Sequence, residues 1–80
     1  MATAFGLAGE DFGQMHELRQ VEQRDGQVRA TAHDPLREGM VVSLGFESRD
    51  LRARRGVVTE CKPSSDGYRV AIRLDASLVA

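Results

Sequence analysis

Arginine side chains are the residues of this chain best suited to chemistry with a partner. A guanidinium group donates paired hydrogen bonds to phosphate or carboxylate. On paired strands, four arginines of the second half would share an outward face and form a candidate surface for an anionic partner: Arg52, Arg54, Arg69 and Arg73. Because acidic residues lie near them in the sequence, an ion-paired exterior explains the same four residues more simply.

Nucleophilic catalysis would need Cys61 or a serine beside His16 or His33 with an orienting acid. Cys61 lies on the inward parity of its expected strand, which favours a small buried hydrophobe. His33 precedes Asp34 in a turn, where the aspartate caps the local backbone. One cysteine and two separated histidines cannot supply four zinc ligands. We therefore expect no enzyme activity, no metal and no cofactor.

Length and charge narrow the function further. Eighty residues form one domain, residues 1–80, and a chain this small leaves a homodimer open as a way to bury more surface. The formal net charge of -1 removes a general attraction to phosphate, so nucleic acid is not an expected partner. No apolar run approaches a membrane span, and the first nine residues do not resemble a signal peptide. We expect a cytoplasmic protein with no membrane contact.

Alternating hydrophobic residues predict strands. Residues 40–46 place Met40, Val42, Leu44 and Phe46 on one face, and residues 68–74 repeat the pattern. A shorter strand spans residues 26–32, with Val28, Ala30 and Ala32 together, and ends before Pro35.

The turn-rich residues 62–67 predict that the strand at 51–61 forms an antiparallel hairpin with the strand at 67–74. We expect a bulge at Arg55-Gly56, which would turn Arg55 outward and leave Val57, Thr59 and Cys61 inward. In the register we expect, Val70 lies opposite Thr59. That register pairs Arg69 with Glu60 as a cross-strand ion pair.

The first quarter of the chain permits two interpretations. Phe12, Met15, Leu18 and Val21 recur every three residues, as on one face of a helix over residues 10–24. The alternative is two strands, at 2–8 and 14–21, joined by a glycine-flanked turn. We favour the strands, because five strands alone would leave an open sheet edge.

With six strands the chain resembles a PilZ domain, a small six-stranded antiparallel β-barrel known mainly as a cyclic di-GMP receptor. Residues 35–44 are similar to the family's Pro-Leu-x-x-Gly and the alternating strand after it. Residues 56–58 are similar to its Gly-x-Val, and residues 67–74 to its closing strand. The resemblance implies a mainly β fold and a context of bacterial cyclic di-GMP signalling, motility or surface attachment.

The family's ligand motifs are missing. Arg-x-x-x-Arg before the first strand has no room, since the first arginine is Arg19. The Asp/Asn-x-Ser-x-x-Gly motif aligns with residues 21–26, where Gly26 alone matches and Val21 and Gln23 replace the polar residues. Arg19 and Arg24 are the candidates for a substitute ligand site. Cyclic di-GMP binding is therefore disfavoured.

We expect a stand-alone PilZ-like regulatory module that binds a partner protein. The competing hypothesis is an SH3-like small barrel that binds nucleic acid or a ribosomal partner, with a pattern at residues 39–42 and 55–58 that fits it. A helix over residues 10–24 would favour this second hypothesis, because it leaves fewer strands.

Overall fold

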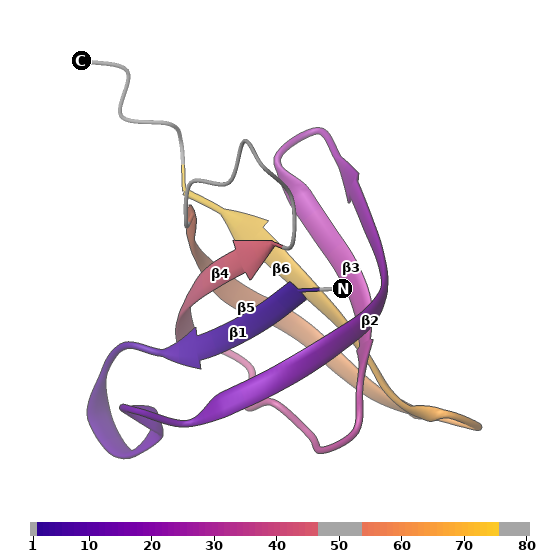
Figure 1. The fold of residues 1–80 in the computed structure, drawn as a ribbon, viewed down its shortest axis with the longest axis horizontal. Helices are drawn as coiled ribbons and strands as arrows, with labels where there is room; N and C mark the ends of the chain where they lie inside the picture. Colours follow the sequence, from indigo (N-terminus) through magenta and orange to yellow (C-terminus); the bar gives the residue numbers. More distant parts are fainter. Residues whose placement is uncertain (1, 47–53, 76–80) are drawn as a thin grey trace.

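Six antiparallel strands hydrogen-bond side by side into a closed barrel in the order β1-β2-β3-β6-β5-β4 (Figure 1). The structure is a computed structural model that describes residues 2–46 and 54–75. The strands are β1 (Ala2–Gly6), β2 (Met15–Arg24), β3 (Gln27–Ala32), β4 (Val41–Phe46), β5 (Arg54–Ser64) and β6 (Gly67–Leu74). One short 3-10 turn, η1 (Gly9–Asp11), lies between β1 and β2. The predicted six-stranded, mainly β fold is confirmed.

The barrel interior is narrow and is filled by alternate residues of every strand. Alanines from β1 and β3 leave room for the larger side chains from β2, β4 and β6. All three predicted inward residues of β3, Val28, Ala30 and Ala32, are fully buried. The largest fully buried side chains are Leu18, Leu44, Ile72, Val28, Val42, Val58 and Thr31.

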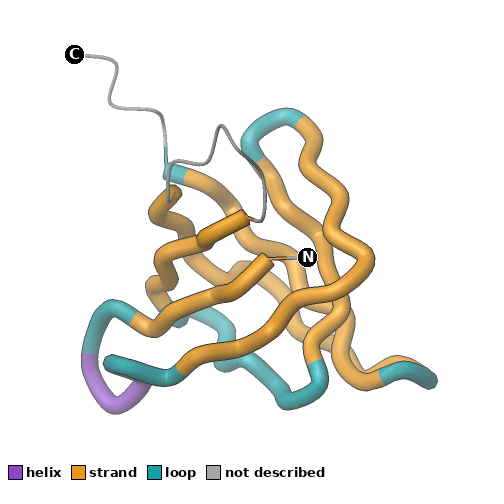
Figure 2. The backbone as a smooth tube through the Cα atoms, viewed as in Figure 1, coloured by secondary structure: helices purple, strands orange, loops and turns teal. Residues whose placement is uncertain are grey.

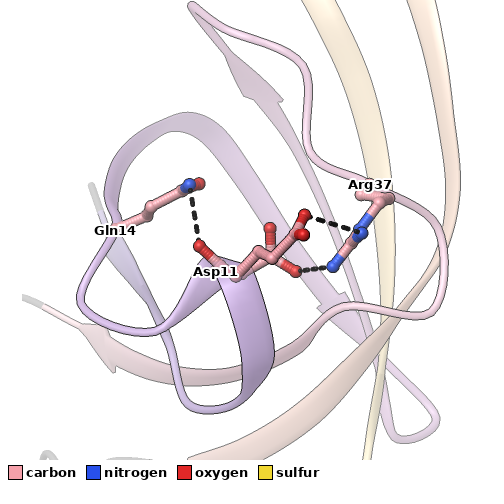
Figure 3. A network of polar contacts seen from close by, with 4 residues as sticks. Asp11, Gln14 and Arg37 are labelled. Carbon is pink, nitrogen blue, oxygen red and sulfur yellow. Dashed lines mark hydrogen bonds and ion pairs between the residues drawn. The ribbon is translucent and has the colours of Figure 1, made fainter.

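Two loops close one end of the barrel. Leu36 and Met40, from the loop between β3 and β4, are buried in the core. Figure 3 shows Arg37 of that loop reaching the η1 turn, where its Nη2 donates to Asp11 Oδ2 and its Nη1 lies 3.9 Å from Glu10 Oε2. This contact ties the β1–β2 loop to the β3–β4 loop.

Residues 10–24 form no helix, so the first-quarter strands are confirmed. A register shift interrupts the β2–β3 pairing between Arg19 and Glu22, and Gln20 within it has φ +53°. The extra residue lets Val21 pack on the core although Leu18, three positions earlier, also faces inward. The bulge on β2 therefore explains why Leu18 and Val21 both face the core although they are three residues apart, an interval that is also typical of a helix. Phe12 and Met15 are 69% and 68% exposed.

The expected bulge on β5 lies at a different place. The β5–β6 register shifts between Val58 and Glu60, whereas Arg55 and Gly56 pair regularly with β4. Val58 is fully buried and Val57 only half-buried, so the inward assignment of Val57 was wrong. Gly56 faces inward and leaves no room for a side chain. A Cβ there would lie 2.8 Å from the Arg73 carbonyl oxygen and 2.8 Å from Ile72 Cγ2.

The partners across the β5–β6 hairpin also differ from those expected, because the strands continue to a short turn in which Ser64 pairs with Gly67. Val70 lies opposite Cys61, not Thr59, and Arg69 lies opposite Lys62, not Glu60. The expected Glu60–Arg69 ion pair is therefore wrong, and Thr59 is exposed. Cys61 packs partly buried against the core, as predicted. Arg55 points outward as expected and lies 3.5 Å from Asp75 Oδ2, although no bulge turns it.

The hairpin also extends beyond the predicted strand end. β5 continues to Ser64 and, with β6, reaches past the other loops of the barrel (Figure 2). The predicted strand begins at residue 51, and its residues 51–53 lie outside the described residues. The side chain of Phe46 lies outside the described part of the structure as well.

Replacing Ile72 by alanine tests the core assignment. Ile72 is fully buried on β6, so Ile72→Ala should lower the free energy of unfolding by about 2–5 kcal/mol. Arg73→Ala, at the next and exposed position, is the control and should change it little. Urea unfolding followed by circular dichroism measures both; equal midpoints for the two variants would contradict the assignment.

Candidate functional site

Six basic side chains lie on the outer face of four neighbouring strands, β2, β3, β6 and β5. We call this surface the basic face: Arg19, Arg24, Arg29, Lys62, Arg69 and Arg73. Each residue sits on the outward parity, because the cross-strand pairing places it opposite another residue that points away from the core. Glu22 and Glu60 are the acidic residues of the three cross-strand rows that span all four strands, and Glu17 of β2 and Arg55 of β5 also face outward, beyond these rows.

One cross-strand row of the basic face runs through Arg19, Thr31, Arg69 and Lys62. Neighbouring strands lie about 4.8 Å apart, so Arg19 and Arg69, two strands apart, are separated by about 10 Å at the backbone. Arg19 Nη2 donates to the Asp66 carbonyl oxygen at 2.9 Å, which holds β2 to the β5–β6 turn.

Arg69 is held by a chain of hydrogen bonds. Its Nη1 donates to Thr31 Oγ1 at 3.0 Å, and the Thr31 hydroxyl donates to Gln20 Oε1 at 2.9 Å. Thr31 is only 1% exposed although it faces outward, because these partners cover it. Gln20 reaches it from the β2 bulge, where the backbone has φ +53°, an unfavourable conformation for a side chain other than glycine or asparagine.

The next row contains a hollow. Arg29, Ala71 and Glu60 lie opposite one another on β3, β6 and β5. Since Ala71 is small and its neighbours are long, a depression of about 190 Å³ forms over it. Its lining residues are Arg29, Glu60, Lys62, Arg69, Val70 and Ala71. Thr59, at the β5 bulge, donates from Oγ1 to the Ala71 carbonyl oxygen at 3.2 Å.

The acidic group of this hollow is paired. Lys62 Nζ lies 2.6 Å from Glu60 Oε1. The hydrogen bond and positive charge of Lys62 lower the pKa of Glu60, burial opposes them, and the charge of Arg29 adds the least of these effects, a further lowering. The same contact raises the pKa of Lys62. Both side chains are therefore charged at neutral pH.

A wider depression of about 680 Å³ surrounds the β2–β3 hairpin. Arg24 lies here with Arg29, but Glu22 and Asp25 line the same space. This is the segment that aligns with the second PilZ ligand motif. Its equal numbers of arginines and carboxylates give it no net charge to attract an anion.

The two sets of arginines predicted as site residues share one outer face only in part. Arg69 and Arg73 share an outward face, and Arg19 and Arg24 join them because β3 pairs with β2 on one side and with β6 on the other. Arg54 does not share it.

Arg54 pairs with the inward-facing Leu44 at the start of β5, and its Nη2 donates to the Asp75 carbonyl oxygen at 3.5 Å. The expectation that Arg54 lies beside Arg69 and Arg73 was wrong, because β5 has no bulge at residues 55–56 and Arg54 therefore shares the parity of the inward-facing Gly56 and Val58. Arg52 lies outside the described residues.

Four residues of the basic face and its support were not singled out from the sequence. Arg29 could have been, because it alternates with Val28 and Ala30. Lys62 was hidden by placing the strand end at Cys61. Thr31 and Gln20 meet through the β2 bulge, for which the sequence carries no glycine signal.

The structure does not bring the cysteine and the two histidines together into one site. Cys61 lies on β5 and His16 on β2, which are separated in the barrel by β3 and β6. His16 Nε2 is buried and has no hydrogen-bond partner among the described residues. His33 is exposed in the loop after β3. Within residues 2–46 and 54–75, no three His, Cys, Asp or Glu side chains gather closely enough to hold a metal ion.

Comparisons with family models, with curated proteins and with solved structures found no match for this chain. No helix within the described ranges is both long and apolar enough to cross a membrane.

Removing the positive charge of Lys62 tests its ion pair with Glu60. Lys62→Met should raise the pKa of Glu60 towards that of an ordinary glutamate, because the ion pair that favours the carboxylate is lost. In the parent protein the pair stabilises the fold at neutral pH, and this contribution disappears as the pH falls through the lowered pKa.

Side-chain carboxyl resonances followed by NMR over a pH titration measure this shift. Arg73→Met removes a charge from the same face without touching Glu60 and serves as the control. An unchanged Glu60 titration in Lys62→Met would contradict the pairing.

Proposed function

We propose that this chain is a non-catalytic interaction module of PilZ-like architecture that binds an acidic segment of a partner protein through its basic face. The observation that carries the proposal is the uneven distribution of charge. The whole chain has a net charge of -1, yet one outer face gathers six cations around two carboxylates. Such a field attracts and orients an acidic partner although the molecule as a whole does not.

The aromatic residues favour a protein partner over nucleic acid. Single-stranded nucleic acid is bound by basic grooves that carry aromatic rings for base stacking. Tyr68 lies opposite the inward-facing Ala32, and Phe5 pairs with β2 and β4 away from the basic face. Phe12 packs edge-on against Phe5 at a ring distance of 6.4 Å. The basic face therefore offers side-chain charge without a stacking platform.

The strand count supports PilZ-like over SH3-like architecture. A helix over residues 10–24 would have favoured the SH3-like hypothesis, and most of that segment is strand β2. The glycines of the PilZ-like motifs occupy restricted positions. Gly67 begins β6 with φ +129°, and a Cβ there would lie 2.3 Å from the Ala32 carbonyl oxygen. A role in bacterial cyclic di-GMP signalling or motility, in the cytoplasm, is the context that this resemblance implies.

Binding of an acidic peptide tests the proposal. A peptide rich in glutamate should bind the full chain, with an affinity that falls as salt screens the charges. Arg29→Glu combined with Arg69→Glu should weaken binding at least tenfold, because two attractive charges become repulsive. Fluorescence anisotropy of the labelled peptide measures this at several salt concentrations.

The matched control is Arg55→Glu, which reverses an exposed charge of β5 outside the basic face. An equal loss in the control would contradict binding at the basic face. Tighter binding of a single-stranded oligonucleotide of equal charge would favour the nucleic-acid hypothesis instead.

Cyclic di-GMP provides a second test. Val21 and Gln23 stand where the family has Asp or Asn and Ser, so we expect that the chain does not bind this ligand at micromolar affinity. Isothermal titration calorimetry measures the binding directly. A dissociation constant below about 10 µM, roughly -7 kcal/mol, would contradict the expectation. Arg19→Ala and Arg24→Ala would then locate the site.

A further inference from the structure

The hollow over Ala71 has the dimensions of a site for one functional group. Small-molecule pockets usually enclose about 300–1,000 Å³, and this depression holds about 190 Å³. Ala71 forms its floor, and long side chains from β3, β5 and β6 form its walls. A compact group carried on a longer segment fits this shape better than a whole ligand does.

The charge of the hollow selects an anion with more than one negative charge. Arg29, Lys62 and Arg69 are its cations, and Glu60 is its carboxylate. The lowered pKa of Glu60 keeps that carboxylate ionised at neutral pH, so two positive charges remain. A phosphate monoester carries about -1.5 to -2 charges at pH 7, whereas a glutamate side chain carries one.

One cation of the hollow is already oriented. Thr31 accepts a hydrogen bond from Arg69 Nη1, and Gln20 accepts one from the Thr31 hydroxyl. The cost of fixing a long side chain is thereby met before a ligand arrives. The second of these hydrogen bonds reaches the β2 bulge, where Gln20 has an unfavourable backbone angle, and such angles persist where the surrounding structure enforces them.

We propose that this hollow binds a phosphate monoester on the acidic segment of the partner, that is, a phosphorylated serine or threonine. The inference rests on the proposed function and assigns the group that the basic face recognises. Arg69 and Arg29 donate to the phosphate oxygens from β6 and β3, and Lys62 approaches from β5. Thr31 acts as a positioning residue for Arg69.

Other charged groups surround the hollow. Glu22 faces Arg29 from β2, and Glu38 acts on Lys62 through its charge. Arg19 lies in the same row as Arg69, with its guanidinium directed to the β5–β6 turn. The pH dependence of binding between pH 5 and 7 should therefore follow the second ionisation of the phosphate, with a pKa near 6, since the pKa of Glu60 is lowered and that of Lys62 is raised, away from this range.

The test uses the full chain and three peptides that differ at one position: phosphoserine, glutamate or serine in the same acidic sequence. We expect the phosphoserine peptide to bind at least tenfold more tightly than the glutamate peptide at pH 7. Its affinity should fall on lowering the pH from 7 to 5.5, as the phosphate takes up a proton. The affinity of the glutamate peptide should change little over that range. Isothermal titration calorimetry and the phosphorus NMR resonance of the peptide report both effects.

Two variants separate the site from general charge. Thr31→Val keeps the shape and removes the acceptor of Arg69, so it should weaken phosphoserine binding several-fold and glutamate binding by less, because a single charge depends less on the orientation of Arg69. Thr59→Val is its matched control, since Thr59 donates to the Ala71 carbonyl oxygen and not to an arginine. Ala71→Leu fills the hollow from outside without changing its charge and should abolish the preference for phosphoserine.

The outcomes distinguish the two proposals. Equal affinities for the phosphoserine and glutamate peptides would overturn the phosphate site and leave the acidic-segment proposal standing. Absence of binding to all three peptides would overturn both. If inorganic phosphate displaced the phosphoserine peptide at a concentration close to the peptide's own dissociation constant, the site would be one for free phosphate, and the phosphorylated partner would be overturned.

Discussion

The closed ring of six short strands is the constraint on which the rest of the molecule depends. Closure pairs the backbone of every strand on both sides and removes the open edges that a small sheet would expose. The ring is narrow, so four inward positions of β1 and β3 carry alanine, and Leu36 and Met40 from a loop fill one end. The contact of Arg37 with the η1 turn then holds the two loops at that end together.

Both bulges of the barrel border the basic face, and this links closure to the candidate site. A bulge bends its strand and increases its twist, which helps a sheet to curve around a small core. On β2 the bulge turns Gln20 towards Thr31, and on β5 it places Glu60 and Lys62 beside Arg29 and Arg69. The two bulges that help the sheet to close therefore also bring together side chains from four strands.

The charge of this surface is a property of the fold and not of the composition. Acidic and basic residues nearly balance along the chain, so the composition argued against a polyanionic partner. Pairing concentrates six of the cations on one face, where the ion pair between Lys62 and Glu60 and the hydrogen bond from Arg69 to Thr31 orient the groups. A neutral chain can in this way present a strongly biased surface to a partner.

The sequence by itself determined the strands, their main inward faces and the class of fold, because alternation along residues 40–46 and 68–74 is a local property that burial on one face requires. It did not determine the position of the β5 bulge, since glycine at position 56 suggested a bulge where close approach to β6 is the reason for the residue. The faces between the expected and the observed bulge are reversed, so Val57 was misassigned. The partner of Arg69 was misassigned for another reason, because the strands continue to a shorter turn in which Ser64 pairs with Gly67. Only the tertiary structure decided that β3 lies between β2 and β6. This strand order places Arg19, Thr31 and Arg69 side by side. The neighbours of a strand in a closed ring depend on long-range pairing, which no local sequence pattern encodes.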